Sequence, residues 1–548
     1  MTALEERTED VTEKGSETPS RGILKYKLYL YLTEFFAGMS VMAAELGASR
    51  LLAPYFSSSQ IVWTIIIGTI MIAMALGNIY GGRSADKEPD PDKLYGRILI
   101  AAVWTAAIPF IGKLVILGIS ALLVVTVSTN FLIWAAFLAC MIIFVYPLFL
   151  LGTVTPSLAK YTVGSLDDSG KTVGTLGAFN TIGSIIGTFV PTFISIPAVG
   201  TAVTFLIFSG ILLALSLVYF ISCKRGRVKI IISSVAFLLC CIFGTRLGFA
   251  FWEEGLAYEG ESIYNYLQVK EDDKKTVLST NVLFGVQSVY MKSGGLTGLY
   301  YDYAMAAPLM SGCGGNGADI LVLGMGTGTY AKQCSEFFDN VTVEGVEIDE
   351  KITGLAREHF SLPESVSVTT YDGRAFLGVC DKKYDVIMVD AYQDITIPFQ
   401  MSSKEFFTLV KGCLKENGVM VVNMNMRSDR KDSINDYLGD TISSVFSEVC
   451  TVNADGSTNR ELFASDCPDM LTAFEKNIGG LENAELKEFM EEVSEGLEPY
   501  HGGDRILTDD KAPVEVLGMQ VIDDLIAGEL SHYKEIFKNE GVKGLLEQ

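Results

Sequence analysis

The chain has little positive charge for its size. It carries 42 Lys and Arg against 65 Asp and Glu in 548 residues, which gives a formal net charge of -23. Proteins that bind nucleic acids need a basic surface to neutralise the phosphates. This deficit therefore argues against a nucleic-acid partner and leaves no basic patch for another polyanion.

Motifs for metals, disulfides and secretion are also missing. Ten cysteines are scattered without a CxxC pair, and Cys240 and Cys241 are neighbours inside an apolar run. This spacing predicts neither a zinc site nor a disulfide framework. Of the three histidines, we interpret His501 as a surface residue without a catalytic role. The polar and charged N-terminus, followed by an apolar run long enough to span, does not predict a cleavable signal.

Long apolar runs are present, and they are confined to residues 28–247. They lie at about 28–50, 60–82, 98–127, 129–152, 173–196, 200–221 and 229–247. Most reach the roughly 20 residues needed to cross a bilayer. We predict a polytopic α-helical membrane domain of about seven spans in the plasma membrane, following a disordered cytoplasmic tail at 1–27. The run at 98–127 contains Lys113, and it fits one tilted helix or two short ones.

Positive charge collects between the apolar runs. The clusters are Arg21, Lys25 and Lys27; Arg83, Lys87, Lys93 and Arg97; Lys160 and Lys171; and Lys224, Arg225 and Arg227. If 98–127 is one helix, all four clusters fall on the same side, as the positive-inside tendency expects. Seven crossings would then put the rest of the chain outside. We expect instead that the second half of the chain is cytoplasmic, which requires either that the last apolar run is re-entrant or that the number of spans differs by one.

The first apolar run contains two carboxylates. Glu34 and Glu45 are about three helical turns apart, so they share one face of the helix, and Arg50 follows them. Carboxylates at membrane depth usually face a cavity or a partner. Two interpretations stay open, a polar conduit, or an interfacial Glu34 with Glu45 paired to Arg50.

The pattern changes to short strands after Trp252. Strands at 264–270, 276–278 and 287–291 predict a small antiparallel β cap within 255–318. From Asp319 onward, strands alternate with helices, and the strands lie at 320–323, 341–346, 366–370, 386–389 and 419–423. This alternation predicts an α/β Rossmann-like domain over 319–548, with a mainly parallel sheet covered on both faces.

A glycine-rich loop follows the first of these parallel strands. Gly324, Gly326 and Gly328 let the backbone turn tightly against a ligand, and Glu347 ends the next strand roughly 20 residues further on. An acid at that position accepts both ribose hydroxyls of an adenosyl group. Asp372 and Asp390 also follow strands, and ligands of such sheets bind at these strand ends.

Further motifs resemble the spermidine synthase-like aminopropyltransferases, in the version fused to a membrane domain. The matching segments are 45–46, 50–56, 180–184, 187–188, 324–328, 347–349, 372–374, 390–392, 397–398, 405–407, 507–510 and 512–515. The resemblance implies a class I adenosylmethionine-type fold and no metal. It also implies transfer of an aminopropyl group from decarboxylated S-adenosylmethionine to an amine such as putrescine, as in spermidine biosynthesis.

The same resemblance assigns roles to individual residues. Glu347 would hold the ribose, Asp372 the adenine amino group, and the three glycines would form the backbone cradle, with Asp349 and Gln287 also on the donor. Asp390 would be the general base, because a protonated amine cannot attack until a carboxylate takes its proton. The residues assigned to the acceptor are Tyr300, Asp302, Tyr392 and Asp394. A homodimer is compatible with this family.

The acceptor pocket departs from the family pattern. Thr327 stands where an acid commonly follows the second glycine, Leu296 and Thr297 replace an acidic pair, and Asn265 stands where a glutamine is expected. Two alternatives therefore stay open. One is a methyltransferase that uses S-adenosylmethionine itself, and the other is a polyamine transporter or sensor whose soluble domain binds a nucleoside or polyamine without turnover.

Overall fold

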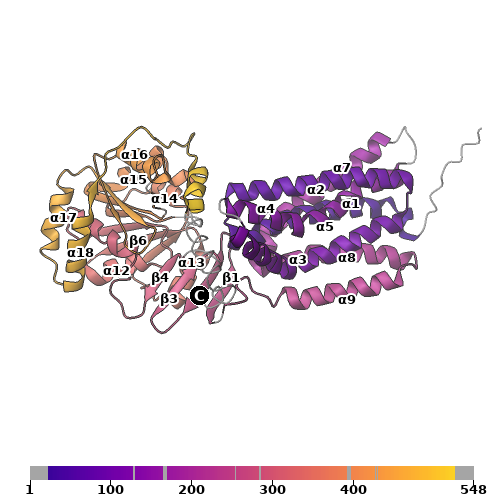
Figure 1. Cartoon of the computed structure of the whole chain (residues 1–548), viewed down its shortest axis with the longest axis horizontal. Coiled ribbons are helices and arrows are strands. Elements are labelled where there is room, and N and C mark those ends of the chain that lie inside the picture. The colour runs from indigo at the N-terminus through magenta and orange to yellow at the C-terminus, as the bar shows by residue number, and fades with distance from the viewer. Residues whose placement is uncertain are drawn as a thin grey trace, which may run out of the picture.

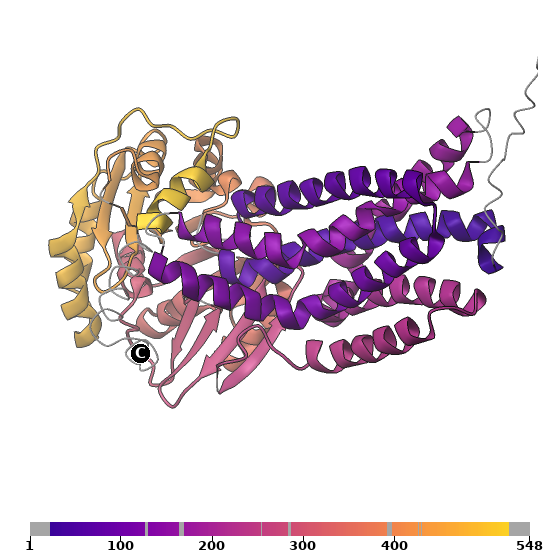
Figure 2. The same ribbon diagram turned by 45° about the vertical axis from the view of Figure 1, so that its right-hand side comes forward.

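The computed structural model of the chain describes residues 22–126, 130–163, 169–253, 255–282, 286–391, 397–425, 427–428 and 430–524. A bundle of long helices forms its first part, and a mixed α/β structure forms its second part (Figure 1). The turned view shows the same helices running toward the strands, which gather at one end of the bundle (Figure 2).

The bundle is built from apolar helices. They are α1 (Lys27–Phe56), α2 (Gln60–Lys87), α3 (Pro91–Thr126), α4 (Phe131–Ile143), α5 (Val145–Gly152), α6 (Val154–Thr162), α7 (Ser169–Val190), α8 (Ile196–Ser222) and α9 (Arg227–Gly244), with short turns η1 (Gly22–Lys25) and η2 (Pro191–Ser195). Among the described residues, five helices are long and apolar enough to cross a membrane, or six if the bent pair α4 and α5–α6 forms one span. That count treats 169–222 as one helix of 54 residues.

Gly200 interrupts this long helix. Its φ of 80° and ψ of 170° are not helical, and both α7 and α8 pack along α1, so the chain reverses direction there. The end of α8 returns to the start of the bundle, where the Ile23 N–H donates to Ser222 Oγ at 3.4 Å. The last apolar run does not have the expected re-entrant form. It is the 18-residue helix α9, which packs against α3 and α8.

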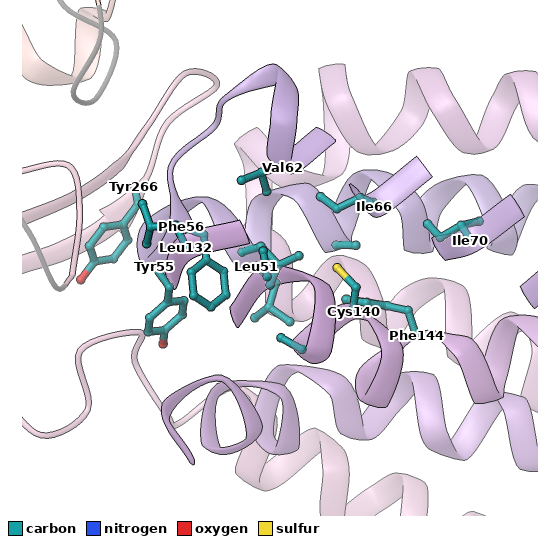
Figure 3. Close-up of a cluster of buried hydrophobic side chains, with 14 of the residues drawn as sticks. Leu51, Tyr55, Phe56, Val62, Ile66, Ile70, Leu132, Cys140, Phe144 and Tyr266 are labelled. Carbon is teal, nitrogen blue, oxygen red and sulfur yellow. The ribbon is translucent and has the colours of Figure 1, made fainter. Parts of the chain in front are cut away.

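An apolar core continues from the bundle into the α/β part. The Tyr55 hydroxyl donates to the Phe249 carbonyl at 2.8 Å, and the ring of Phe249 lies 5.1 Å from that of Tyr266. Figure 3 shows Tyr55, Phe56 and Tyr266 at one end of a buried cluster that extends along the helices. The end of α1 is thus fixed to the neighbouring strands by apolar packing.

A four-stranded antiparallel sheet lies at this junction. Its strands pair in chain order and are β1 (Leu256–Glu261), β2 (Tyr266–Glu271), β3 (Lys275–Ser279) and β4 (Ser288–Met291). The last three correspond to the predicted cap strands, whereas β1 was not predicted. We call residues 262–265 the β1–β2 turn.

The second sheet has eight strands in the order β12-β10-β11-β9-β8-β5-β6-β7. The strands are β5 (Asp319–Leu323), β6 (Thr342–Glu347), β7 (Ser367–Thr370), β8 (Tyr384–Val389), β9 (Leu414–Met424), β10 (Glu448–Asn453), β11 (Arg460–Ser465) and β12 (Glu498–Pro499). Strands β5 to β9 are mutually parallel, and β9, β11, β10 and β12 pair antiparallel. The predicted Rossmann-like sheet is confirmed. The antiparallel extension was not predicted.

Helices cover both faces of this sheet. They are α10 (Tyr300–Ala304), α11 (Ala306–Met310), α12 (Thr329–Phe337), α13 (Glu350–His359), α14 (Gly373–Val379), α15 (Lys404–Cys413), α16 (Ile434–Ser443), α17 (Met470–Ile478) and α18 (Ala484–Gly496), with the turn η3 (Phe399–Met401). Successive strand residues point to opposite faces. In β5, Ile320 and Val322 therefore pack in one core, while Leu321 and Leu323 pack in the other.

Candidate active site

A cavity of about 340 Å³ lies at the carboxyl ends of the parallel strands. The order of the sheet places β5 between β6 and β8, so the direction in which strands are added reverses between β5 and β8. Open α/β sheets bind their ligands at this point. Gly324, Glu347, Asp372 and Asp390, all predicted from the sequence, line the cavity together.

The glycine-rich loop forms one wall. Gly324 has a φ of +80°, and a Cβ atom there would lie 2.5 Å from the Asp390 carbonyl oxygen and from the Ala391 Cα. Gly326 also has a positive φ of 54° and lines the cavity. Gly328, with a φ of 81°, starts α12 without lining the cavity. Position 324 thus requires glycine for two reasons. Its positive φ disfavours other residues, and the chain after β8 passes too close to leave room for a side chain.

Glu347 ends β6 and holds the loop. Its Oε2 accepts from the Gly326 N–H at 2.9 Å, and its Oε1 accepts from the Asp349 N–H at 3.0 Å. Burial raises the pKa of this carboxyl, which the backbone donors partly offset. A buried carboxylate with unused lone pairs at the cavity wall suits a pair of hydroxyl donors.

Asp349 lies behind this wall and does not line the cavity in the described structure. Its Oδ2 accepts from Ser262 Oγ at 2.5 Å and from Asn265 Nδ2 at 3.2 Å. Both donors belong to the β1–β2 turn. Asp349 also caps α13 by accepting from the Lys351 N–H. It therefore positions Glu347 and the turn.

Two further predicted residues line the other parts of the cavity. Asp372 begins α14 and accepts from the Ala375 N–H at 2.8 Å, which leaves its second oxygen available to a ligand. Gln287 precedes β4, and its carbonyl accepts from the Tyr301 hydroxyl at 2.9 Å. Gln287 lines the cavity together with Leu278 and Ser288 of the small antiparallel sheet.

Asp390 follows β8 and is fixed by two donors. Its Oδ2 accepts from the Tyr300 hydroxyl at 2.6 Å, and its Oδ1 accepts from Asn423 Nδ2 at 2.8 Å. Asn423 is in turn oriented by Asn459, whose Nδ2 donates to its Oδ1 at 2.8 Å. The carboxylate is thus held in one orientation beside the glycine loop.

Burial raises the pKa of Asp390 to about 7, and the nearby Glu347 charge adds to this rise. The hydrogen bonds from Tyr300 and Asn423 act in the opposite direction, because they stabilise the carboxylate. A general base works best when its pKa lies near the operating pH. A carboxyl group with such a pKa can act as a general base near neutral pH.

The structure does not bring Asp302 to the cavity. Its carboxylate accepts from the backbone and hydroxyl of Thr297, from the Gly298 N–H, and from Gln333 Nε2. These contacts stabilise the loop before α10, which carries Tyr300. Tyr392 and Asp394 lie outside the described residues, so their assignment to the acceptor stays a prediction.

Two polar side chains near Asp390 were not identified from the sequence. Asn423 ends a predicted parallel strand, and the rule that ligands bind at strand ends could have identified it. Glu461 lies on β11, a strand that was not predicted, and is completely buried. Within the described ranges, no group of three or more His, Cys, Asp or Glu side chains is placed to hold a metal ion.

The sheet order and the site define an α/β protein with a cavity at the ends of its parallel strands, where a glycine-rich loop lies beside a buried carboxyl group. Comparison with known proteins gives the family. Residues 299–454 match the spermine/spermidine synthase domain. A probable polyamine aminopropyl transferase of Bifidobacterium longum is 53% identical over 350 residues, covering 61% of this chain and 78% of the relative. The chain belongs to the polyamine aminopropyltransferase family and is a transferase, which confirms the family predicted from the motifs.

Other similar proteins carry related descriptions. The polyamine aminopropyltransferase of Vibrio vulnificus is 26% identical over 218 residues, covering 38% of this chain and 71% of the relative. A probable spermidine synthase structure from Corynebacterium glutamicum has 19% identity and a TM-score of 0.35, covering 46% of this chain and 97% of that one. A spermidine synthase bound to the transition-state analogue AdoDATO has 16% identity and a TM-score of 0.36, covering 44% and 88%.

Proposed function

We propose that the chain transfers an aminopropyl group from decarboxylated S-adenosylmethionine to an amine such as putrescine, in polyamine biosynthesis. The observation that carries this proposal is the pairing of Glu347 with Asp390 across one cavity. Glu347 can accept hydrogen bonds from the ribose hydroxyls of an adenosyl group, and Asp390 can take the proton of an attacking amine. The glycine cradle and Asp372 fit the rest of the adenosyl group.

The reaction needs one proton transfer and one displacement. The acceptor arrives as an ammonium ion, and Asp390 takes its proton. The free amine nitrogen then attacks the propyl carbon attached to sulfur, so that a C–N bond forms as the C–S bond breaks. The sulfonium leaves as the neutral thioether methylthioadenosine. Holding nucleophile and carbon in line supplies a large part of the rate enhancement, and the proton transfer supplies about 10²- to 10⁴-fold.

The product distinguishes this reaction from the alternatives. We expect the purified full-length protein to form methylthioadenosine from decarboxylated S-adenosylmethionine and putrescine, as measured by chromatography of the nucleoside products. A methyltransferase would form adenosylhomocysteine from S-adenosylmethionine instead. Binding of either donor without any nucleoside product would support the transporter or sensor, and both outcomes would contradict our proposal.

We also propose that the chain has four regions, a tail at 1–27, a membrane domain at 28–247, a cap at 255–318 and the catalytic domain at 319–548. Large apolar side chains face outward from the bundle, among them Met71 at 66%, Ile232 at 64% and Leu238 at 60% exposure. An outer surface of this kind suits lipid. A helix of 54 residues would be about 80 Å long, far more than a bilayer core, so the break at Gly200 supports two crossings and seven in all.

The charges at the two ends of the bundle indicate its orientation. The described residues of the four positive clusters, joined by Lys229, lie at the end of the bundle far from the catalytic domain (Figure 1), where ion pairs such as Lys160–Asp86 and Arg225–Asp92 occur. Two of the connections at the other end, 57–59 and 191–200, contain no charged residue, and the segment that follows α9 there contains Arg246, Glu253 and Glu254. Short cytoplasmic loops are rich in Lys and Arg. This asymmetry favours an extracytoplasmic catalytic domain, opposite to the side expected from the sequence.

Protease access in intact cells tests the orientation. We expect a tag after Gln548 to be removed by protease added to cells whose outer barriers have been opened, while a tag before Met1 stays protected until the inner membrane is permeabilised. The reverse pattern would place the catalytic domain in the cytoplasm. Neither result changes the assignment of the reaction, which rests on the cavity. A homodimer stays a prediction, and its mass in detergent would test it.

A further inference from the structure

The described part of the cavity offers one acid to the acceptor, although a diamine carries two positive charges. Asp390 faces the reacting nitrogen. Asp302 is occupied by Thr297, Gly298 and Gln333. An amine with a second ammonium group would therefore leave that charge without a partner in this wall of the site, and burying an unpaired charge is very costly.

Glu461 continues the row of polar side chains that starts at Asp390. Strands β8, β9 and β11 are neighbours. Asn423 of β9 donates to Asp390, and Glu461 of β11 is the direct pairing partner of Asn423. Directly opposed residues of an antiparallel pair share one face of the sheet. Asp390, Asn423 and Glu461 therefore lie side by side on the face that helix α10 covers.

The carboxyl group of Glu461 is buried without a hydrogen-bond partner among the described residues. The residue is 0% exposed, and both of its carboxyl oxygens lack such a partner. A buried polar group without a partner destabilises the fold. Its surroundings include Tyr301, Tyr330 and Asp390, each of which interacts with it electrostatically and lines the cavity. Glu461 itself does not line the cavity, whereas Tyr301, Tyr330 and Asp390 do.

We propose that Glu461 is the counter-charge for the second ammonium group of a diamine acceptor, and that it makes the site prefer diamines to monoamines. This inference rests on the proposed aminopropyl transfer. Three side-chain torsions allow the carboxyl group to turn toward the cavity. Burial and the Asp390 charge raise the pKa of Glu461. A dication between Asp390 and Glu461 removes their repulsion and favours the ionised form of both.

Equilibrium binding tests this role without requiring turnover. Putrescine and butylamine have the same carbon chain but differ by one ammonium group. We expect calorimetry on the full chain saturated with methylthioadenosine to show tighter binding of putrescine, by about 10-fold or more. The Glu461→Gln variant is expected to remove this preference while butylamine and methylthioadenosine bind as before.

Two further variants separate a charge effect from a structural one. Glu461→Asp keeps the charge and is expected to retain most of the preference, which a purely structural role would not predict. Glu448→Gln, on the neighbouring strand β10, is the matched control and should bind both amines like the wild type. Thermal unfolding should show Glu461→Gln to be about as stable as the wild type, because an uncharged side chain of the same shape replaces the buried carboxyl group.

Equal binding of the two amines by the wild type, or an unchanged preference in Glu461→Gln, would overturn the role of Glu461. Failure of the proposed reaction has a different signature, because no methylthioadenosine would then form with either amine. A wild type that converts butylamine and putrescine equally well would retain the reaction and refute the counter-charge.

Discussion

Replacing Asp390 with asparagine is expected to lower kcat by a factor of about 10² to 10⁴, with little change in donor affinity. The amide cannot take the proton of the acceptor, whereas the cavity wall that contacts the adenosyl group stays in place. Single-turnover formation of methylthioadenosine measures the first quantity, and calorimetry with the donor measures the second. A variant that keeps more than about a tenth of the wild-type rate would show that Asp390 is not the base.

The pH dependence of kcat/KM in the wild type and in Asp390→Asn is a second test of the role of Asp390. Asp390 must be deprotonated to accept a proton, and its pKa is about 7, so kcat/KM is expected to fall as the pH drops below about 7. The Asp390→Asn variant should lack this dependence. Tyr300→Phe removes a donor that stabilises the carboxylate, and it should therefore shift the rising limb to higher pH. If the rising limb has the same midpoint in Tyr300→Phe as in the wild type, then a group other than Asp390 causes it.

Replacing Glu347 with glutamine is expected to weaken donor binding by at least about 100-fold. Hydrogen bonds to a charged acceptor contribute about 1.5–3 kcal/mol each, and an adenosyl ribose would make two of them. The amide also cannot accept from both Gly326 and Asp349, so the glycine loop loses a support. Calorimetric titration with decarboxylated S-adenosylmethionine and with S-adenosylmethionine measures the effect.

Glu344 provides the control for this variant. It lies three positions earlier on β6, and its carboxylate contacts Lys382 and Tyr384 away from the cavity. Glu344→Gln should therefore bind donor like the wild type. Unchanged affinity of Glu347→Gln for both donors would remove Glu347 from the donor site and with it the assignment of the cavity.

Much of the catalytic half was predictable because its signals are local. The strands β5 to β9 are short apolar runs, and the glycines and acids stand at their carboxyl ends. Asp302 and Asp349 show the limit of such reasoning. Both acids fit the spacing, but Asp302 accepts hydrogen bonds from the loop before α10, and Asp349 accepts them from the β1–β2 turn. Sequence spacing does not reveal which donors an acid finds within its own neighbourhood.

The row of Asp390, Asn423 and Glu461 was not predictable for a different reason. It depends on the pairing of β8 with β9 and of β9 with β11, and these pairings join residues that are distant in the chain. Nothing in the residues around Glu461 indicates that it lies beside Asp390. In the bundle, by contrast, the apolar runs at 173–196 and 200–221 were predicted as separate spans from the sequence, and the helical conformation is interrupted at Gly200.

The β1–β2 turn has a practical consequence for anyone who wishes to study the enzyme in isolation. On one side, Glu261 accepts from Thr201 of α8 at 2.8 and 2.5 Å, and the Ile263 carbonyl accepts from Arg50 of α1. On the other side, Ser262 and Asn265 support Asp349 and, through it, Glu347. A fragment that begins after α9 would lack Arg50 and Thr201, which hold this turn in place. The nucleoside affinity of such a fragment would therefore not represent that of the intact protein.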